Sequence, residues 1–164
     1  MNQNITNFDL STTAMALEEK WNVIVMDWSS LSHTFITNAR SQVLLAGELL
    51  GNFTAFLRTT FQIDLKTLHY IGHGLGVNVS AKAAEVVSRE HDTKVGRLTA
   101  LDPVKGLFEI RQFLDLKDSS DFVDVVHTDG DGMGTMSPMG HVDYYPNGGK
   151  GQPHCSSCEY LNQN

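Results

Sequence analysis

The sequence predicts an α/β fold in which a mostly parallel sheet is flanked by helices. Short apolar runs of strand length alternate with longer segments of helical periodicity. The strand runs are continuous rather than alternating, which is typical of parallel strands buried on both faces. No apolar run reaches the roughly 18 residues of a membrane span. The 164 residues are therefore expected to form one domain, 1–164.

The first half of the chain predicts two helices and one strand. A short helix is expected to end at Lys20, and the β-branched run at 21–27 predicts a buried strand. The clearest helix covers 36–57, where apolar residues recur every three or four positions. Gly47 and Gly51 weaken this helix by about 1 kcal/mol each, unless a neighbouring element packs closely there.

The second half predicts three further strands and one helix. The strands are expected at 68–71, 98–101 and 122–126, and the helix at roughly 75–89. Pro103 ends the middle strand, because proline cannot donate to a sheet ladder. Beyond the last strand the chain is rich in glycine and is expected to form loops.

The turn before the second long helix has the spacing of a nucleophile elbow. Gly72, Gly74 and Gly76 match the frame G-x-S-x-G, in which a serine at a sharp strand-to-helix turn attacks an acyl carbonyl. The serine position is Gly74, which has no side chain. A dinucleotide-binding turn is the alternative, and Val77 stands where that motif needs its last glycine or alanine. The turn therefore has the form of an enzyme site but lacks its nucleophile.

The composition argues against one class of partner. The net charge of −7 and the lack of a basic block argue against nucleic-acid binding. The first residues contain neither the basic segment nor the apolar segment of a signal peptide, so no signal peptide is expected in this chain.

Five segments in order along the chain carry a resemblance to a known family. They are N-V-I-V-M-D-W at 22–28, H-Y-I-G-H-x-L-G at 69–76, L-T-A-L-D-P at 98–103, F-V-D-V-V-H-T-D at 122–129 and G-H-V-D-Y-Y-P-N-G-G at 140–149. They resemble the pancreatic-lipase-like animal neutral lipases, and most nearly insect lipases and position-1-specific phospholipases. The resemblance implies a partial α/β-hydrolase fold, truncated at both ends. It also implies secreted proteins that hydrolyse carboxylic esters of triglycerides or phospholipids.

The resemblance assigns catalytic positions residue by residue. Asp102 matches the triad acid, the backbone N–H of Leu75 matches one oxyanion donor, and Gly74 occupies the nucleophile position. The triad histidine is absent. Tyr160 takes its place if Cys158 is the cysteine that precedes it in the family, and otherwise the histidine would follow the last residue of this chain. The upstream His-Gly loop, which supplies the second oxyanion donor, is also missing.

The missing serine and histidine determine the function that we expect. Removing a triad serine or histidine lowers turnover by about 10⁶-fold. We therefore expect a catalytically inactive lipase homologue that binds a lipid or acyl ester, or a truncated isoform of a secreted lipase-like protein. The alternative is an active carboxylic-ester hydrolase, either a triacylglycerol lipase or a position-1-specific phospholipase. His73, His127 and His141 are expected to be structural.

Two acidic segments are candidates for binding calcium. Asp115 and Asp118 match family carboxylates near a structural calcium site, and a solvated acidic loop is the alternative. Residues 129–132 read Asp-Gly-Asp-Gly, but they lack the rest of a calcium-binding loop and predict a turn. No other cofactor is expected.

Cysteines and glycosylation motifs matter if the chain is secreted. The resemblance implies that Cys155 closes a lid loop by a disulfide, either with Cys158 or with a cysteine outside this chain. Asn4, Asn52 and Asn78 begin N-glycosylation sequons. Asn78 starts the helix after the elbow and is expected to be buried, so Asn4 and Asn52 are the candidates.

Overall fold

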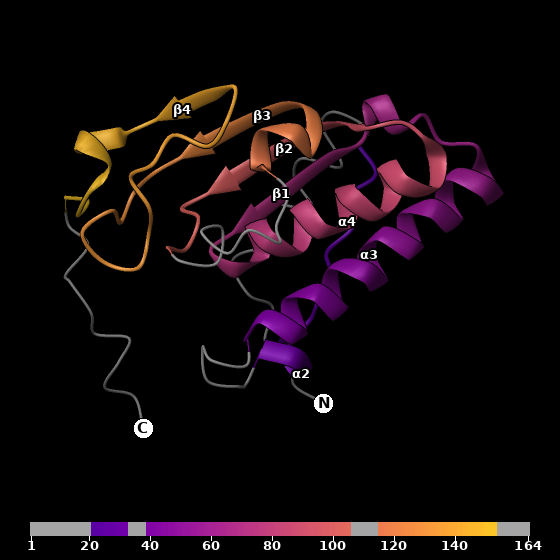
Figure 1. Ribbon diagram of the computed structural model, residues 1–164, viewed down its shortest axis with the longest axis horizontal. Helices are drawn as coiled ribbons and strands as arrows, with labels where there is room; N and C mark the ends of the chain where they lie inside the picture. The colour runs from indigo at the N-terminus through magenta and orange to yellow at the C-terminus, as the bar shows by residue number, and fades with distance from the viewer. Residues whose placement is uncertain (1–20, 33–38, 106–114, 154–164) are drawn as a thin grey trace.

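The computed structural model describes residues 21–32, 39–105 and 115–153. Within them, one long helix packs on one side of a four-stranded parallel sheet, and a second long helix packs on the first (Figure 1). The elements are α2 Ser29–Ser32, α3 Ala39–Phe61, η2 Leu65–Thr67, β1 His69–His73, α4 Leu75–His91, β2 Val95–Leu101, η3 Leu116–Asp118, β3 Ser120–Val126, β4 Val142–Tyr144 and η4 Pro146–Gly149.

The strands lie in the order in which they occur in the chain, β1-β2-β3-β4, and every neighbouring pair is parallel. Gly72 of β1 is in register with Ala100 of β2, which is in register with Val125 of β3. Parallel strands place all their carboxyl ends at one edge of the sheet. The turns after β1, β2 and β3 therefore gather at that edge and form one site.

The main core lies between α4 and the sheet. Apolar residues recur along the inner face of α4, as the helical periodicity predicts, and they meet the buried alternate residues of the strands. The fully or almost fully buried members include Val77, Ala81, Ala84, Val87, Leu98, Ala100, Val123 and Val125. This packing fixes the start of α4 relative to the ends of the strands.

α3 packs along α4 through its two glycines. A Cβ atom at Gly47 would lie 2.5 Å from Cβ of Lys82, and one at Gly51 would lie 2.6 Å from Cβ of Val86. The close packing that would justify glycine inside a helix is therefore present.

The sheet has one covered and one uncovered face among the described residues. Tyr70 and Gly72 of β1 are buried, whereas Ile71 between them is 56% exposed. On the uncovered face Arg97 donates to both carboxylate oxygens of Asp124 at 2.9 and 3.0 Å. The prediction of strands buried on both faces is wrong for this part of the chain, because no described helix packs on the second face.

The predicted strand at 21–27 is also wrong. The structure gives this segment no regular secondary structure, and Val23, Ile24 and Val25 are 40%, 60% and 53% exposed. A β-branched run becomes a strand only when a neighbouring strand supplies a ladder, and among the described residues β1 pairs only with β2. The predicted helix ending at Lys20 lies outside the described residues.

The prediction of loops beyond β3 missed a fourth strand. β4 contains only three residues, and Asp124, Val125 and Val126 of β3 pair with it. A short strand among glycines has no periodicity of its own, so its ladder with β3 defines it.

Candidate functional site

The elbow between β1 and α4 has the positive-φ geometry of a nucleophile turn. Gly74 has φ 55° and ψ −119°, and α4 begins at the next residue. Its N–H donates to the carbonyl of Leu101 at 2.9 Å, which joins the elbow to the end of β2. A Cβ atom at Gly72 would lie 2.5 Å from the carbonyl oxygen of Gly76, so Gly72 lets strand and helix approach closely.

The described residues leave space beside Gly74. Among them, a Cβ atom built at Gly74 would meet only Cγ2 of Val104, at 3.8 Å, which is an ordinary van der Waals distance. A serine would therefore fit in volume, but its positive φ would cost about 1–3 kcal/mol. Glycine avoids this strain, so the turn keeps its shape without the side chain that would use it.

Leu75 supplies a helix-start amide at the elbow. It is the first residue of α4, and the first four N–H groups of a helix have no acceptor within it. The positive end of the helix dipole also lies here. The Leu75 N–H can therefore donate to an anionic oxygen beside position 74, which is the oxyanion role that the resemblance assigns to it.

Asp102 lies at the end of β2, next to the elbow. Its Oδ1 accepts the backbone N–H groups of Thr128 and Asp129, both at 2.9 Å. Its own N–H donates to the carbonyl of Val126 at 2.7 Å, and its φ is 47°, a strained value for a residue with a side chain. Two strand ends thus hold the carboxylate in place, and among the described residues nothing donates to Oδ2.

No described histidine bonds to Asp102. His127 is fully buried, with Nδ1 2.7 Å from the carbonyl of Thr135 and Nε2 2.8 Å from Oδ1 of Asp143. His141 accepts the N–H of Val123 at 3.0 Å through Nδ1. These contacts agree with the structural roles expected for both. His73 is exposed at the end of β1.

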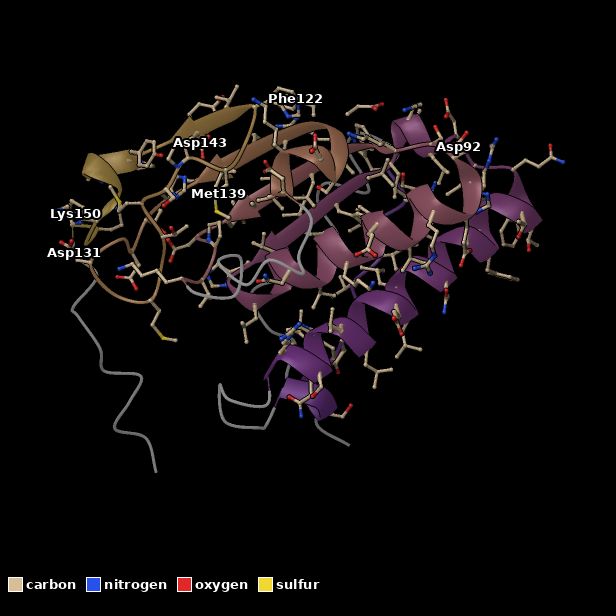
Figure 2. All side chains as sticks on the ribbon, in the orientation of Figure 1. Asp92, Phe122, Asp131, Met139, Asp143 and Lys150 are labelled. Atoms are coloured by element: carbon tan, nitrogen blue, oxygen red, sulfur yellow. The ribbon has the colours of Figure 1, made fainter. Side chains whose placement is uncertain are left out.

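The cluster around His127 was not foreseen. Tyr145 stacks on the imidazole, with ring centroids 4.4 Å apart and planes 6° apart. Burial opposes ionisation of Asp143, but the bonds from His127 and from the N–H groups of Met139 and Gly140 outweigh it and lower its pKa. Figure 2 shows Asp143 close to Met139. The sequence offers no spacing signal for this cluster, because β4 itself was not predicted.

The described carboxylates do not make up a calcium site. Oδ1 of Asp115 accepts the N–H of Lys117 at 3.3 Å, and Asp118 lies 3.9 Å from Nζ of Lys94. Calcium takes about six to eight oxygen ligands, and no group of three or more potential ligands occurs in the part of the chain that the structure describes. Residues 106–114, beside these two carboxylates, lie outside that part.

The Asp-Gly-Asp-Gly segment forms a turn, as predicted. Asp129 accepts the N–H of Met133 at 3.1 Å, and Nζ of Lys105 donates to the carbonyl of Gly130 at 2.6 Å. A lysine ammonium thus occupies the carbonyl side of the turn. Asp131 pairs with Lys150 at 3.3 Å at the same end of the molecule (Figure 2).

A cavity of about 340 Å³ lies at the opposite edge of the sheet from the elbow. It is bounded by the second half of α4 and by the segments that enter β2 and β3. Its lining residues are Ala84, Glu85, Ser88, Arg89, Lys94, Asp118 and Ser119. It is therefore separate from the strand ends that carry Gly74 and Asp102.

The sequons differ in accessibility. Asn78 is fully buried and Asn52 is exposed on α3, as expected for Asn78. Asn4 lies outside the described residues, and so do Cys155 and Cys158.

Comparisons with known proteins agree with the resemblance read from the motifs. A family model described as Lipase matches residues 5–163. The chain is 35% identical over 150 residues to hepatic triacylglycerol lipase of Bos taurus, covering 87% of this chain. It is 36% identical over 145 residues to pancreatic triacylglycerol lipase of Homo sapiens, covering 84%. It is also 36% identical over 148 residues to inactive pancreatic lipase-related protein 1 of Canis lupus familiaris, again covering 84%.

The chain spans about 30% of the length of these relatives. None of the helices in the described residues is long and apolar enough to cross a membrane. The four parallel strands and their flanking helices form part of an α/β-hydrolase fold. The chain belongs to the lipase family that includes the pancreatic and hepatic triacylglycerol lipases.

Proposed function

We propose that this chain is a catalytically silent lipase homologue that binds a lipid or acyl ester without hydrolysing it. The observation that carries the proposal is Gly74 at the elbow, where the backbone makes the positive-φ turn but the residue has no nucleophile. The elbow lies at the carboxyl ends of parallel strands, where α/β sheets commonly bind ligands.

The remaining groups are too few for turnover. Asp102 and the N–H of Leu75 stand near the elbow, and no described histidine joins them. Loss of a triad serine or histidine costs about 10⁶-fold in turnover, and loss of an oxyanion donor costs about 10²–10³-fold. A similar relative of this family is itself named as inactive.

Hydrolysis of a short-chain activated ester tests whether the chain is catalytically inactive. The folded parent and its Gly74→Ser variant are assayed together, and a fluorophosphonate probe reports any reactive serine. We expect no turnover and no labelling of the parent. Labelling of a serine in the parent would establish the alternative, an active carboxylic-ester hydrolase. Thermal unfolding of both proteins shows that each is folded before the assay.

Binding is tested separately with a fluorescent long-chain ester. Val104→Asp places a charge within van der Waals reach of position 74 and is expected to weaken binding. Phe61→Asp, at the exposed end of α3, is the matched control and is expected to leave binding unchanged. Equal affinity of both variants and the parent would show that the ligand does not bind at the elbow.

We also propose an extracellular location, on the strength of the family resemblance. Immunodetection of the natural protein in culture medium, against cell lysate, tests this. A structural calcium near Asp115 and Asp118 stays a prediction, tested by the change in unfolding temperature on adding calcium and then a chelator.

A further inference from the structure

α3 carries a second apolar stripe that points away from α4. Leu45, Leu49, Phe53 and Phe56 are 47%, 52%, 41% and 53% exposed. Their helical spacing places them along one side of the helix, and the helix contacts α4 through its opposite side, which carries Gly47. Contiguous apolar patches of this kind are uncommon on soluble proteins unless something covers them.

Asn52 stands within this stripe. It follows Leu49 by three positions and precedes Phe56 by four, so these side chains share one face of the helix. Asn52 is exposed and is followed by Phe53 and Thr54, which completes an N-glycosylation sequon. The Thr54 hydroxyl is buried and bonded to Tyr70 in the folded chain. Oligosaccharide transfer precedes folding, so this burial does not prevent it.

We propose that Asn52 carries an N-linked glycan and that this glycan covers the exposed stripe on α3. In the transfer step, Nδ2 of Asn52 loses a proton and forms a bond to the anomeric carbon of an oligosaccharide. The bond from that carbon to the lipid-diphosphate donor breaks, and the lipid diphosphate leaves. A glycan is bulky and strongly hydrated, so it replaces the contact between these apolar side chains and bulk water. The inference rests on the extracellular location proposed above.

Asn78 provides an internal comparison. It begins the sequon Asn78-Val79-Ser80, but it is fully buried in α4, and Ser80 is only 4% exposed. A glycan added to Asn78 before folding has no room in the folded chain, so a chain modified there cannot reach this fold. Secreted, folded protein is therefore expected to carry a glycan at Asn52 and none at Asn78.

The test is expression of the full chain through the secretory pathway of a eukaryotic cell, followed by glycopeptide mass spectrometry. Asn52→Gln is expected to lose one glycan, whereas Ser80→Ala, which removes the buried sequon, is expected to lose none. Secreted, folded protein with an unmodified Asn52 would overturn the proposal.

A second measurement tests the covering of the stripe. Enzymatic removal of the glycan, or Asn52→Gln, is expected to raise the fluorescence of an apolar dye severalfold. Leu49→Lys and Phe56→Lys in the Asn52→Gln background should abolish that rise, since they remove exposed apolar surface. Unchanged dye fluorescence after deglycosylation would show that the glycan leaves the stripe open.

The two proposals fail in different ways. Natural protein found only inside cells would refute the extracellular location. An unoccupied Asn52 in chain that has passed through the secretory pathway would refute the glycan, whatever the natural location. Loss or gain of ester hydrolysis affects neither result.

Discussion

Replacing Tyr70 with phenylalanine should lower stability at neutral pH and raise it in strong alkali. Tyr70 is 8% exposed, and its hydroxyl lies 2.6 Å from Oγ1 of Thr54. Burial raises the pKa of Tyr70 to about 12, while the bond with Thr54 opposes the shift. The folded state therefore resists ionisation of this phenol, and the unfolded state does not.

Two free-energy contributions set the pH at which Tyr70→Phe becomes more stable than the parent. At neutral pH the variant loses one buried hydrogen bond, worth about 1 kcal/mol, and Thr54 still bonds to the carbonyl of Leu50. Because the folded pKa is raised, the contribution of the neutral phenol is complete below pH 10 and is lost as pH rises toward about 12. At about pH 11 that loss amounts to about 1.4 kcal/mol. The variant should therefore become the more stable protein near pH 11.

Urea unfolding from about pH 8 to pH 11.5 measures this difference. Lysines titrate over the same range, but they do so in both proteins, so the difference between the two curves isolates Tyr70. Tyr144→Phe, at a side chain that is 52% exposed, is the matched control for removal of a tyrosine hydroxyl and should leave the stability at neutral pH unchanged. A constant difference between Tyr70→Phe and the parent at every pH would refute the reasoning.

Three further changes test the packing and the polar clusters. Gly51→Ala should destabilise the protein by up to about 2 kcal/mol in urea unfolding, because overpacking against Val86 exceeds the gain in helix propensity; a stabilised variant would contradict the close approach of α3 and α4. Asp143→Asn should cost about 1–3 kcal/mol at neutral pH, since it weakens the bond to buried His127. Its effect should fade in acid as pH falls through the lowered pKa of Asp143, below the ordinary 3.8; an effect that persists there would show that the contribution does not come from the ionised Asp143 carboxylate. Lys105→Met should speed amide exchange in the glycine-rich turn whose carbonyls Lys105 binds, and unchanged exchange would show that the ammonium is not needed there.

Periodicity predicted the elements that carry their own pattern. The helices found at Ala39–Phe61 and Leu75–His91 lie within a few residues of those expected, and β2 ends before Pro103. Periodicity failed where strand formation depends on pairing with a neighbouring strand. The run at 21–27 has strand composition but no ladder, whereas β4 has little strand pattern but pairs with β3.

The candidate site shows the same division. The glycine spacing predicted a tight strand-to-helix turn, and the structure places Gly74 at φ 55° there. The sequence could not show that Asp102 is held by two amides after β3, because that contact depends on the register of β2 and β3. Nor could it show the stack of Tyr145 on His127, which joins the last strand to the core. The finer resemblance to insect lipases and position-1-specific phospholipases stays a prediction.

The elbow keeps its geometry without a nucleophile because its backbone contacts do not involve the side chain at position 74. Gly72 allows β1 and α4 to meet, and the N–H of Gly74 donates to Leu101 whatever residue stands there. A serine in this turn is a strained residue that catalysis alone requires. In a chain that does not hydrolyse esters, as proposed above, that strain has no compensating function, and glycine is the residue that relieves it. Gly74→Ser is therefore expected to lower the free energy of unfolding by about 1–3 kcal/mol without restoring hydrolysis, and a serine variant as stable as the parent would show that the elbow is unstrained.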